Sequence, residues 1–145
     1  MAAYATEQQF IDQFGQQETI QLTNLEDPSA VAVDTAVLQA ALDRATEEID
    51  SFIVQRYDLP LVVLPVTLVQ ACMDIARYRL DNNSTRDNVE KRYDDAIRWL
   101  RWIAEGKVSL NVPVAEEGEA AGDVIHSAPP RVFSSTSLSQ FAGDI

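Results

Sequence analysis

The chain has 145 residues, 46% of them hydrophobic, and 23 Asp and Glu against 11 Lys and Arg give it a formal net charge of −12. This length predicts one domain with its own core, and the acidic balance argues against tight DNA binding, which needs clustered Lys and Arg. The single cysteine, Cys72, excludes an intramolecular disulfide, and the single histidine, His126, excludes a structural zinc site of His and Cys ligands.

The N-terminal segment predicts a short helix. Thr6 and Gln9 have the spacing of a capping box, in which each side chain bonds the backbone N–H of the other residue. Gly15 then ends the helix, and the stretch around Leu22 is ambiguous. The first ten residues have neither the basic nor the apolar region of a signal peptide, so we expect assembly in the cytosol.

Residues 35 to about 56 predict the longest helix, which Asp34 caps at its N-terminus. Apolar residues from Leu38 to Ile53 recur every three or four positions and form one face of this helix. The opposite face is mostly acidic, with Asp43, Glu47, Glu48 and Asp50. We expect this helix to form the backbone of the domain.

Two further helices follow. The longest apolar run, residues 59–66, is too short to cross a membrane and is interrupted by Pro60 and Pro65. Pro65 suits the first turn of a helix that continues to Leu80, in which Cys72 lies on the apolar face and is expected to be buried. The next helix runs from about residue 85 to 105 and stops at Gly106.

Two tryptophans in this last helix form its most distinctive surface feature. Trp99 and Trp102 are three positions apart and therefore share a face, and Arg98 and Arg101 precede them. Tryptophan beside arginine is typical of interface hot spots. The sequence leaves open whether these tryptophans form an interface or belong to the core.

The composition changes after Gly106. Residues 107–114 alternate well enough to predict a short strand, with Pro113 near its end. Fifteen of the 31 residues from 115 to 145 are Gly, Ala, Ser or Pro, which is too little apolar material for a core. We therefore expect an all-α fold, a bundle of about four helices in residues 1–110, with an extended C-terminal arm in residues 111–145.

The sequence offers no pattern for catalysis or for a cofactor. It has no phosphate-binding glycine loop and no nucleophile or metal motif. His126 has no acid or nucleophile pattern nearby, and the spacing of Glu90 and Asp94, with Lys91 and Arg92 between them, fits a solvated charged face. We expect no enzyme activity, no cofactor and no bound metal.

Charge is distributed unevenly along the chain. The net formal charge is −9 over residues 1–60, +2 over residues 77–107 and −4 over residues 108–145. Unlike charges on different faces suit the head-to-tail association of copies. A charged surface that only maintains solubility explains the same pattern.

The order and spacing of several segments resemble one known family. These segments are listed here: residues 4–6, 14–15, 49–52, 56–61, 72–78 (Cys-Met-Asp-Ile-Ala-Arg-Tyr), 92–97, 103–107 and 131–134. Together they are similar to the head-tail connector proteins of Mu-type phages and prophages, over about residues 4–110 plus the motif in the arm.

This resemblance implies a structural adaptor in the neck of the virion. It implies a ring of copies, with twelve as the expected number, beneath the portal protein, joining the capsid to a tail or tail-completion protein. Genomic DNA would pass through the ring without specific binding, and no catalytic residue is carried over. We expect the acidic face of residues 35–56 to line the channel.

We expect the arm, with Arg131, Val132 and Phe133, to pack on a neighbouring subunit or on the portal.

Two other functions remain open on the sequence alone. The alternative to a connector is a small acidic helical regulator, or nucleic-acid mimic, that binds a protein partner. A mimic should be a monomer or dimer, and an enzyme is the most distant possibility.

Overall fold

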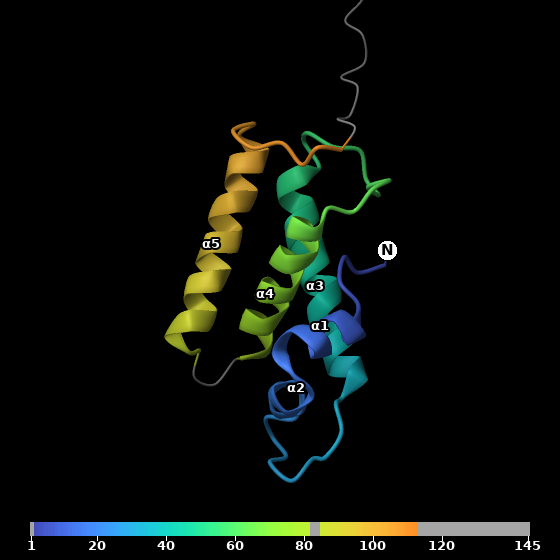
Figure 1. Cartoon of the computed structure of the whole chain (residues 1–145), viewed down its shortest axis with the longest axis vertical. Coiled ribbons are helices and arrows are strands. Elements are labelled where there is room, and N and C mark those ends of the chain that lie inside the picture. Colours follow the sequence, from blue (N-terminus) through green and yellow to red (C-terminus); the bar gives the residue numbers. More distant parts are fainter. Residues whose placement is uncertain (1, 82–84, 113–145) are drawn as a thin grey trace, which may run out of the picture. The chain divides into compact units, whose positions relative to one another are not determined.

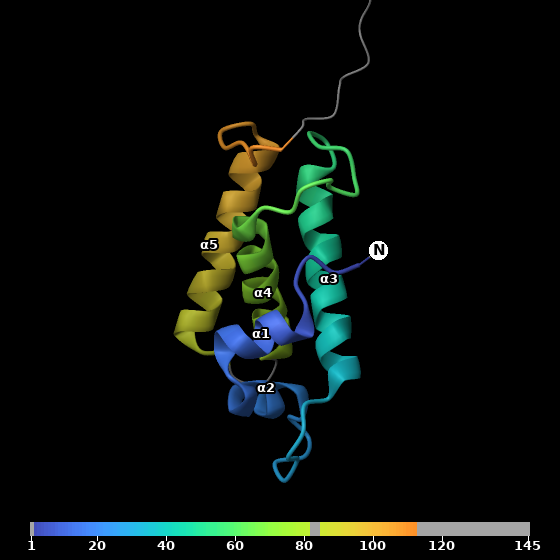
Figure 2. The same cartoon turned by 45° about the vertical axis from the view of Figure 1, so that its right-hand side comes forward.

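A computed structural model describes residues 2–81 and 85–112, and these residues form five helices and no strand. The helices are α1 (Glu7–Phe14), α2 (Gln16–Thr23), α3 (Thr35–Ile53), α4 (Val66–Leu80) and α5 (Asp87–Ala104). The three long helices α3, α4 and α5 lie side by side, and α1 and α2 lie near one end of them (Figures 1 and 2). The predicted all-α fold is confirmed.

Helix α2 is a fifth helix where about four were expected. Its sequence is rich in Gln and Thr and has no clear apolar stripe. Its buried threonines are accommodated because the Thr19 and Thr23 hydroxyls donate to the carbonyls of Gly15 and Thr19, both at 2.8 Å. Gly15 has φ +92°, which lets the chain turn sharply between α1 and α2.

The strand predicted for residues 107–114 is wrong in its described part, residues 107–112. The N–H groups of Lys107 and Val108 donate back to the Trp102 carbonyl at 2.8 and 3.2 Å, so this segment first wraps the end of α5. The Leu110 N–H then donates to the Tyr57 hydroxyl at 2.9 Å. These partners replace a neighbouring strand, and Pro113 and Val114 lie outside the described residues.

Helix α3 begins where predicted, because the Asp34 carboxylate accepts the Val37 N–H at 3.1 Å. It ends at Ile53, three residues earlier than expected. There the N–H groups of Arg56 and Tyr57 both donate to the Ile53 carbonyl, and the tightened turn buries Tyr57 in the core. Nineteen residues give α3 a length of about 28 Å.

The core lies between α3, α4 and α5, with α1 covering one side. The fully buried large side chains include Phe10 of α1; Leu38, Leu42, Ile49 and Ile53 of α3; Leu68 and Ile75 of α4; and Val89, Leu100 and Ile103 of α5. Cys72 is also fully buried, as the sequence predicts. This core fixes the long helices as a scaffold for the surfaces described below.

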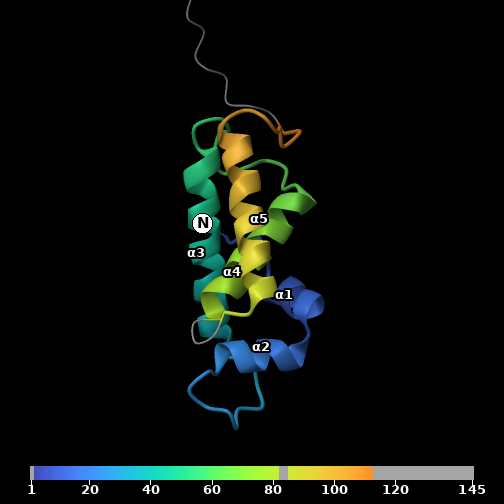
Figure 3. The same ribbon diagram turned by 90° about the vertical axis from the view of Figure 1, so that its left-hand side faces the viewer.

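Polar bonds attach the short helices and the N-terminal segment to that scaffold. Glu18 of α2 accepts from Arg77 of α4 and from Arg86, which directly precedes α5. The Tyr4 N–H donates to the Thr46 hydroxyl at 2.9 Å, and the Tyr4 hydroxyl donates to the Asp50 carboxylate. Figure 3 shows α1 and α2 at the end of the bundle where α4 stops and α5 starts.

Candidate protein-interaction surfaces

The two tryptophans of α5 have different environments. Trp99 is half-buried and packs against the core, whereas Trp102 is 43% exposed. Arg98 pairs with Asp95 at 3.1 Å, and Arg101 is exposed. The structure thus assigns Trp99 to the edge of the core and leaves Trp102 and Arg101 at the surface, where their role as an interface remains a prediction.

Trp99 also lines a groove between α4 and α5, called here the α4–α5 groove. It has a volume of about 590 Å³, and its lining includes Thr67, Gln70, Asp74 and Arg92. Burial raises the pKa of Asp74, against the opposing effects of its hydrogen bond from Gln70 and of Arg92, 3.6 Å away. An aromatic ring beside a partly buried charge pair is a composition found at protein interfaces.

The four acidic residues predicted to line a channel are all on α3 but do not form one uniform surface. Glu48 accepts from Arg79 of α4 at 2.5 Å and from the Tyr93 hydroxyl of α5 at 2.9 Å. Asp50 accepts from Tyr4, and Asp43 accepts from a glutamine one turn earlier. Only Glu47 is exposed.

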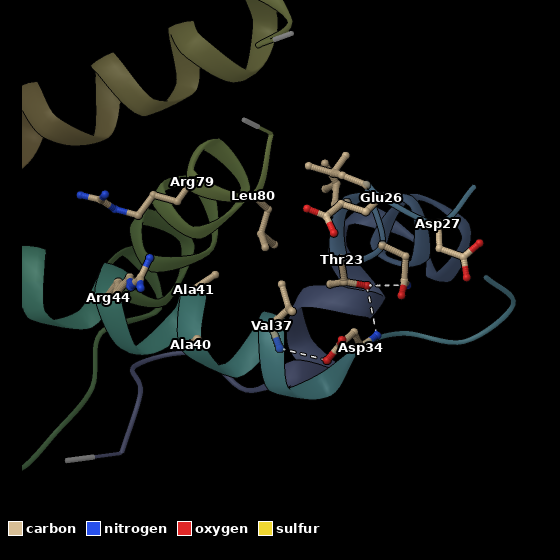
Figure 4. Close-up of a pocket in the computed structure, with 13 residues that line it drawn as sticks. Thr23, Glu26, Asp27, Asp34, Val37, Ala40, Ala41, Arg44, Arg79 and Leu80 are labelled. Atoms are coloured by element: carbon tan, nitrogen blue, oxygen red, sulfur yellow. Dashed lines mark hydrogen bonds between the residues drawn. The ribbon is translucent and has the colours of Figure 1, made fainter. Parts of the chain in front are cut away.

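A second groove lies at the α2 end of the bundle, called here the end groove. It has a volume of about 600 Å³. Its apolar lining is Leu22, Leu25, Val37, Ala40, Ala41 and Leu80, and its charged lining is Glu26, Asp27, Asp34, Arg44 and Arg79. Figure 4 shows Val37, Ala40 and Ala41 along one helix, with the carboxylates of Glu26 and Asp27 toward one end and the two arginines toward the other.

At the opposite end of α3, residues 54–66 connect α3 to the first residue of α4 and carry several exposed apolar side chains; this segment is called here the valine loop. Leu59 and Leu61 pack against the core and anchor it. Val54, Val62, Val63 and Val66 point into solvent, with 91% exposure at Val62. The apolar run of residues 59–66 was visible in the sequence, but the packing of Leu59 and Leu61 against the core and the exposure of the residues that follow them depend on how the loop folds.

The part of the chain that the structure describes holds no candidate metal centre. The described part contains no cluster of three His, Cys, Asp or Glu residues able to hold a metal, and burial raises the pKa of the Cys72 thiol. No helix there is long and apolar enough to cross a membrane. His126, Arg131, Val132 and Phe133 lie outside the described residues.

Comparison with known proteins identifies the family. The profile of the family described as Bacteriophage Mu, Gp36 matches residues 4–127. The chain belongs to this family. It is 36% identical over 117 residues to the Mu-like prophage FluMu protein gp36 of Haemophilus influenzae, covering 81% of this chain and 82% of that protein.

A second relative supports the same assignment. Gene product J of Escherichia phage Mu is 34% identical over 105 residues, which cover 70% of this chain and 73% of that protein. The Gp36 match spans all five helices and extends beyond the described residues. The chain is therefore a Mu-type phage protein, in agreement with the resemblance that its sequence indicates.

Proposed function

We infer that this Gp36 family member is a structural head-tail connector of a phage or prophage particle, without enzyme activity. The observation that carries this proposal is the family match over residues 4–127, to relatives from phage Mu and a Mu-like prophage. The fold is consistent with it, because its exposed features are apolar and aromatic surfaces suited to protein contacts. In this proposal copies form a ring at the portal vertex, twelve being the expected number.

The exposed surfaces described above can supply the several contacts that such a ring requires. Each subunit needs contacts to two neighbours, to the portal protein and to a tail or tail-completion protein. The end groove lies at one end of the bundle, and the valine loop and the last turn of α5, which bears Trp102, lie at the other (Figure 1). Separate surfaces let one small chain hold several partners at once.

The acidic surface of α3 is proposed to face the DNA channel through Glu47 and Asp43. Glu48 is paired with Arg79, so it contributes less free charge, and Asp50 accepts from Tyr4 and is only partly exposed. A channel lined by carboxylates repels the phosphate backbone and lets DNA pass without being retained. A reconstruction of the particle that turns Glu47 to the outer surface of the ring would contradict this part of the proposal.

The C-terminal arm is proposed to contact a neighbouring subunit or the portal through Arg131, Val132 and Phe133. The test is Phe133→Ala in a phage carrying this gene, with Ser134→Ala as the matched control. We expect F133A to lower the yield of joined heads and tails at unchanged protein level. Equal yields from the two variants would contradict the role of Phe133.

The experiment that tests the whole function is electron microscopy of purified virions together with native mass measurement of the isolated protein. A ring of this chain between capsid and tail supports the connector. A protein absent from virions, and a monomer or dimer that competes with DNA for a third protein, would instead indicate an acidic nucleic-acid mimic. In that case the connector proposal fails.

A further inference from the structure

Two exposed apolar surfaces lie at opposite ends of α3. The end groove adjoins its N-terminal turn through Asp34 and Val37, and the valine loop continues directly from its C-terminus. Figures 1 and 2 show these two ends at the bottom and the top of the bundle. Since α3 is about 28 Å long, the loop and the groove of one subunit cannot meet each other.

The valine loop is apolar at its tip and has cations beside it. Val62 and Val63 are 91% and 59% exposed, and Val66 is exposed as well. At this end of the bundle Glu105 pairs with Lys107 at 2.5 Å, and Asp58 is exposed. Arg56 and Arg101 have no ion-pair partner among the described residues, so the described side chains named here carry one more positive than negative charge.

The end groove complements the valine loop, because it has an apolar lining and an excess of negative charge. Its apolar lining includes Leu25 and Val37, each 40% exposed and so available to a ligand. Residues 24–34 contribute Glu26, Asp27 and Asp34 and no Lys or Arg. Arg79 in the lining is already paired with Glu48, which leaves Arg44 against three carboxylates. The balance at the groove is therefore negative.

We propose that the valine loop of one copy docks in the end groove of the next copy. Apolar side chains then cover apolar lining, and Arg56 and Arg101 approach the carboxylates of residues 24–34. The contact joins two different surfaces, so every added copy presents a new loop and a new groove, and the series ends only when a ring closes. This inference rests on the proposed connector function and specifies the contact between neighbours.

The first test is a cross-link between the two surfaces in the full chain. Val62→Cys combined with Leu25→Cys places one thiol on each, and buried Cys72 contributes little background. Mild oxidation should give a ladder of covalent dimers, trimers and larger species. The matched control combines Val62→Cys with Glu90→Cys, on an exposed position of α5, and should give at least tenfold less material above the dimer.

Three results with these cysteine variants would overturn the docking contact. One is a double variant that forms no more ladder than its control. Another is efficient dimer formation by Val62→Cys alone, which would mean that valine loops pair with each other. A Val62 thiol that reacts slowly in dilute monomer would show that the chain's own arm covers the loop, and this too contradicts the proposal.

A mixing experiment tests whether the contact joins the loop of one copy to the groove of another. Val62→Asp destroys the loop and Leu25→Asp destroys the groove, both at exposed sites where circular dichroism should show unchanged helicity. Each variant alone should sediment as a monomer, and an equal mixture should stop at a heterodimer with one intact loop-to-groove contact. If both variants assemble like the wild type, the docking contact is refuted but the proposed ring is not. If the wild-type protein forms no ring, even in virions, the connector function itself is refuted.

Discussion

The Arg77 guanidinium donates two hydrogen bonds to the same oxygen of the Glu18 carboxylate, at 2.5 and 2.8 Å, although the two residues are 59 positions apart in the chain. The side chain of Arg77 is only 9% exposed, and its guanidinium also lies 4.5 Å from the centre of the Phe14 ring. Arg86 donates to the same Glu18 oxygen at 2.7 Å. One carboxylate thus connects α2 to α4 and to the start of α5.

Glu18→Gln should therefore destabilise the fold. It removes the negative charge opposite a buried arginine, and we expect the free energy of unfolding to fall by about 2 kcal/mol. Urea denaturation followed by circular dichroism measures this. Asp95→Asn is the control, because the Asp95–Arg98 pair is exposed and should contribute less than about 0.5 kcal/mol. Equal losses from the two substitutions would contradict the role assigned to Glu18.

Glu18 also predicts how stability depends on pH. Burial alone would raise its pKa, but the hydrogen bonds from Arg86 and Arg77 lower the pKa below its ordinary value. A lowered folded-state pKa means that the stabilisation is complete above the unfolded pKa of about 4.3 and is lost as the pH falls through the folded value. The midpoint of urea unfolding should therefore fall less between pH 5 and 3 in Glu18→Gln than in the wild type.

Asp74 should contribute a pH dependence of stability opposite in sign to that of Glu18. Burial raises its pKa in the folded protein despite Gln70 and Arg92, so the ionised carboxylate is disfavoured and stability is lost as the pH rises through the folded value. Asp74→Asn should raise the free energy of unfolding at pH 7, by about 1 kcal/mol or less, and have a smaller effect at pH 3. A loss of stability at pH 7 would show that the contact with Arg92 outweighs burial.

Gly15→Ala tests backbone conformation without a steric collision. A Cβ at Gly15 would meet no heavy atom within 4 Å, yet its φ of +92° is unfavourable for alanine. We expect a loss of about 1–2 kcal/mol in the free energy of unfolding. Ala30→Gly in the loop after α2 is a control for general loop effects. A Gly15→Ala protein as stable as the wild type would contradict the need for glycine at the junction of α1 and α2.

Substitution of Trp99 should affect the stability of the fold, whereas substitution of Trp102 should affect assembly. Trp99→Ala removes a ring packed against the core and should cost about 2–3 kcal/mol, whereas Trp102→Ala should change the free energy of unfolding by less than about 1 kcal/mol. If Trp102 contacts a neighbour, W102A should still shift the protein toward monomer in sedimentation. Unchanged assembly would assign Trp102 to the solvated surface.

The parts of the fold that the sequence predicted share a local physical cause. Asp34 and Thr6 cap the helices that follow them, and the apolar spacing from Leu38 to Ile53 fixes the buried face of α3. The short strand was predicted from alternation alone. Whether an alternating segment becomes a strand depends on a neighbour to pair with, and here Tyr57 and the end of α5 occupy its hydrogen bonds.

The surfaces were harder to predict because they depend on packing between distant segments. The sequence singled out Trp99 and Trp102 together, but helix position alone could not show that one packs on the core. It grouped Glu48 with Glu47 as acidic surface, whereas Glu48 is bound by Arg79 and Tyr93 from two other helices. The end groove had no sequence signal, since its lining comes from α2, the following loop, α3 and α4.

The full burial of Cys72 determines how the protein responds to an oxidising environment. Its sulfur lies within 3.7 Å of the Thr46 hydroxyl and has no exposed surface. Burial raises the pKa of the thiol, so little of the reactive thiolate forms at neutral pH. In the proposed connector ring, Cys72 would therefore form no disulfides between subunits when the particle passes from a reducing cell into an oxidising medium.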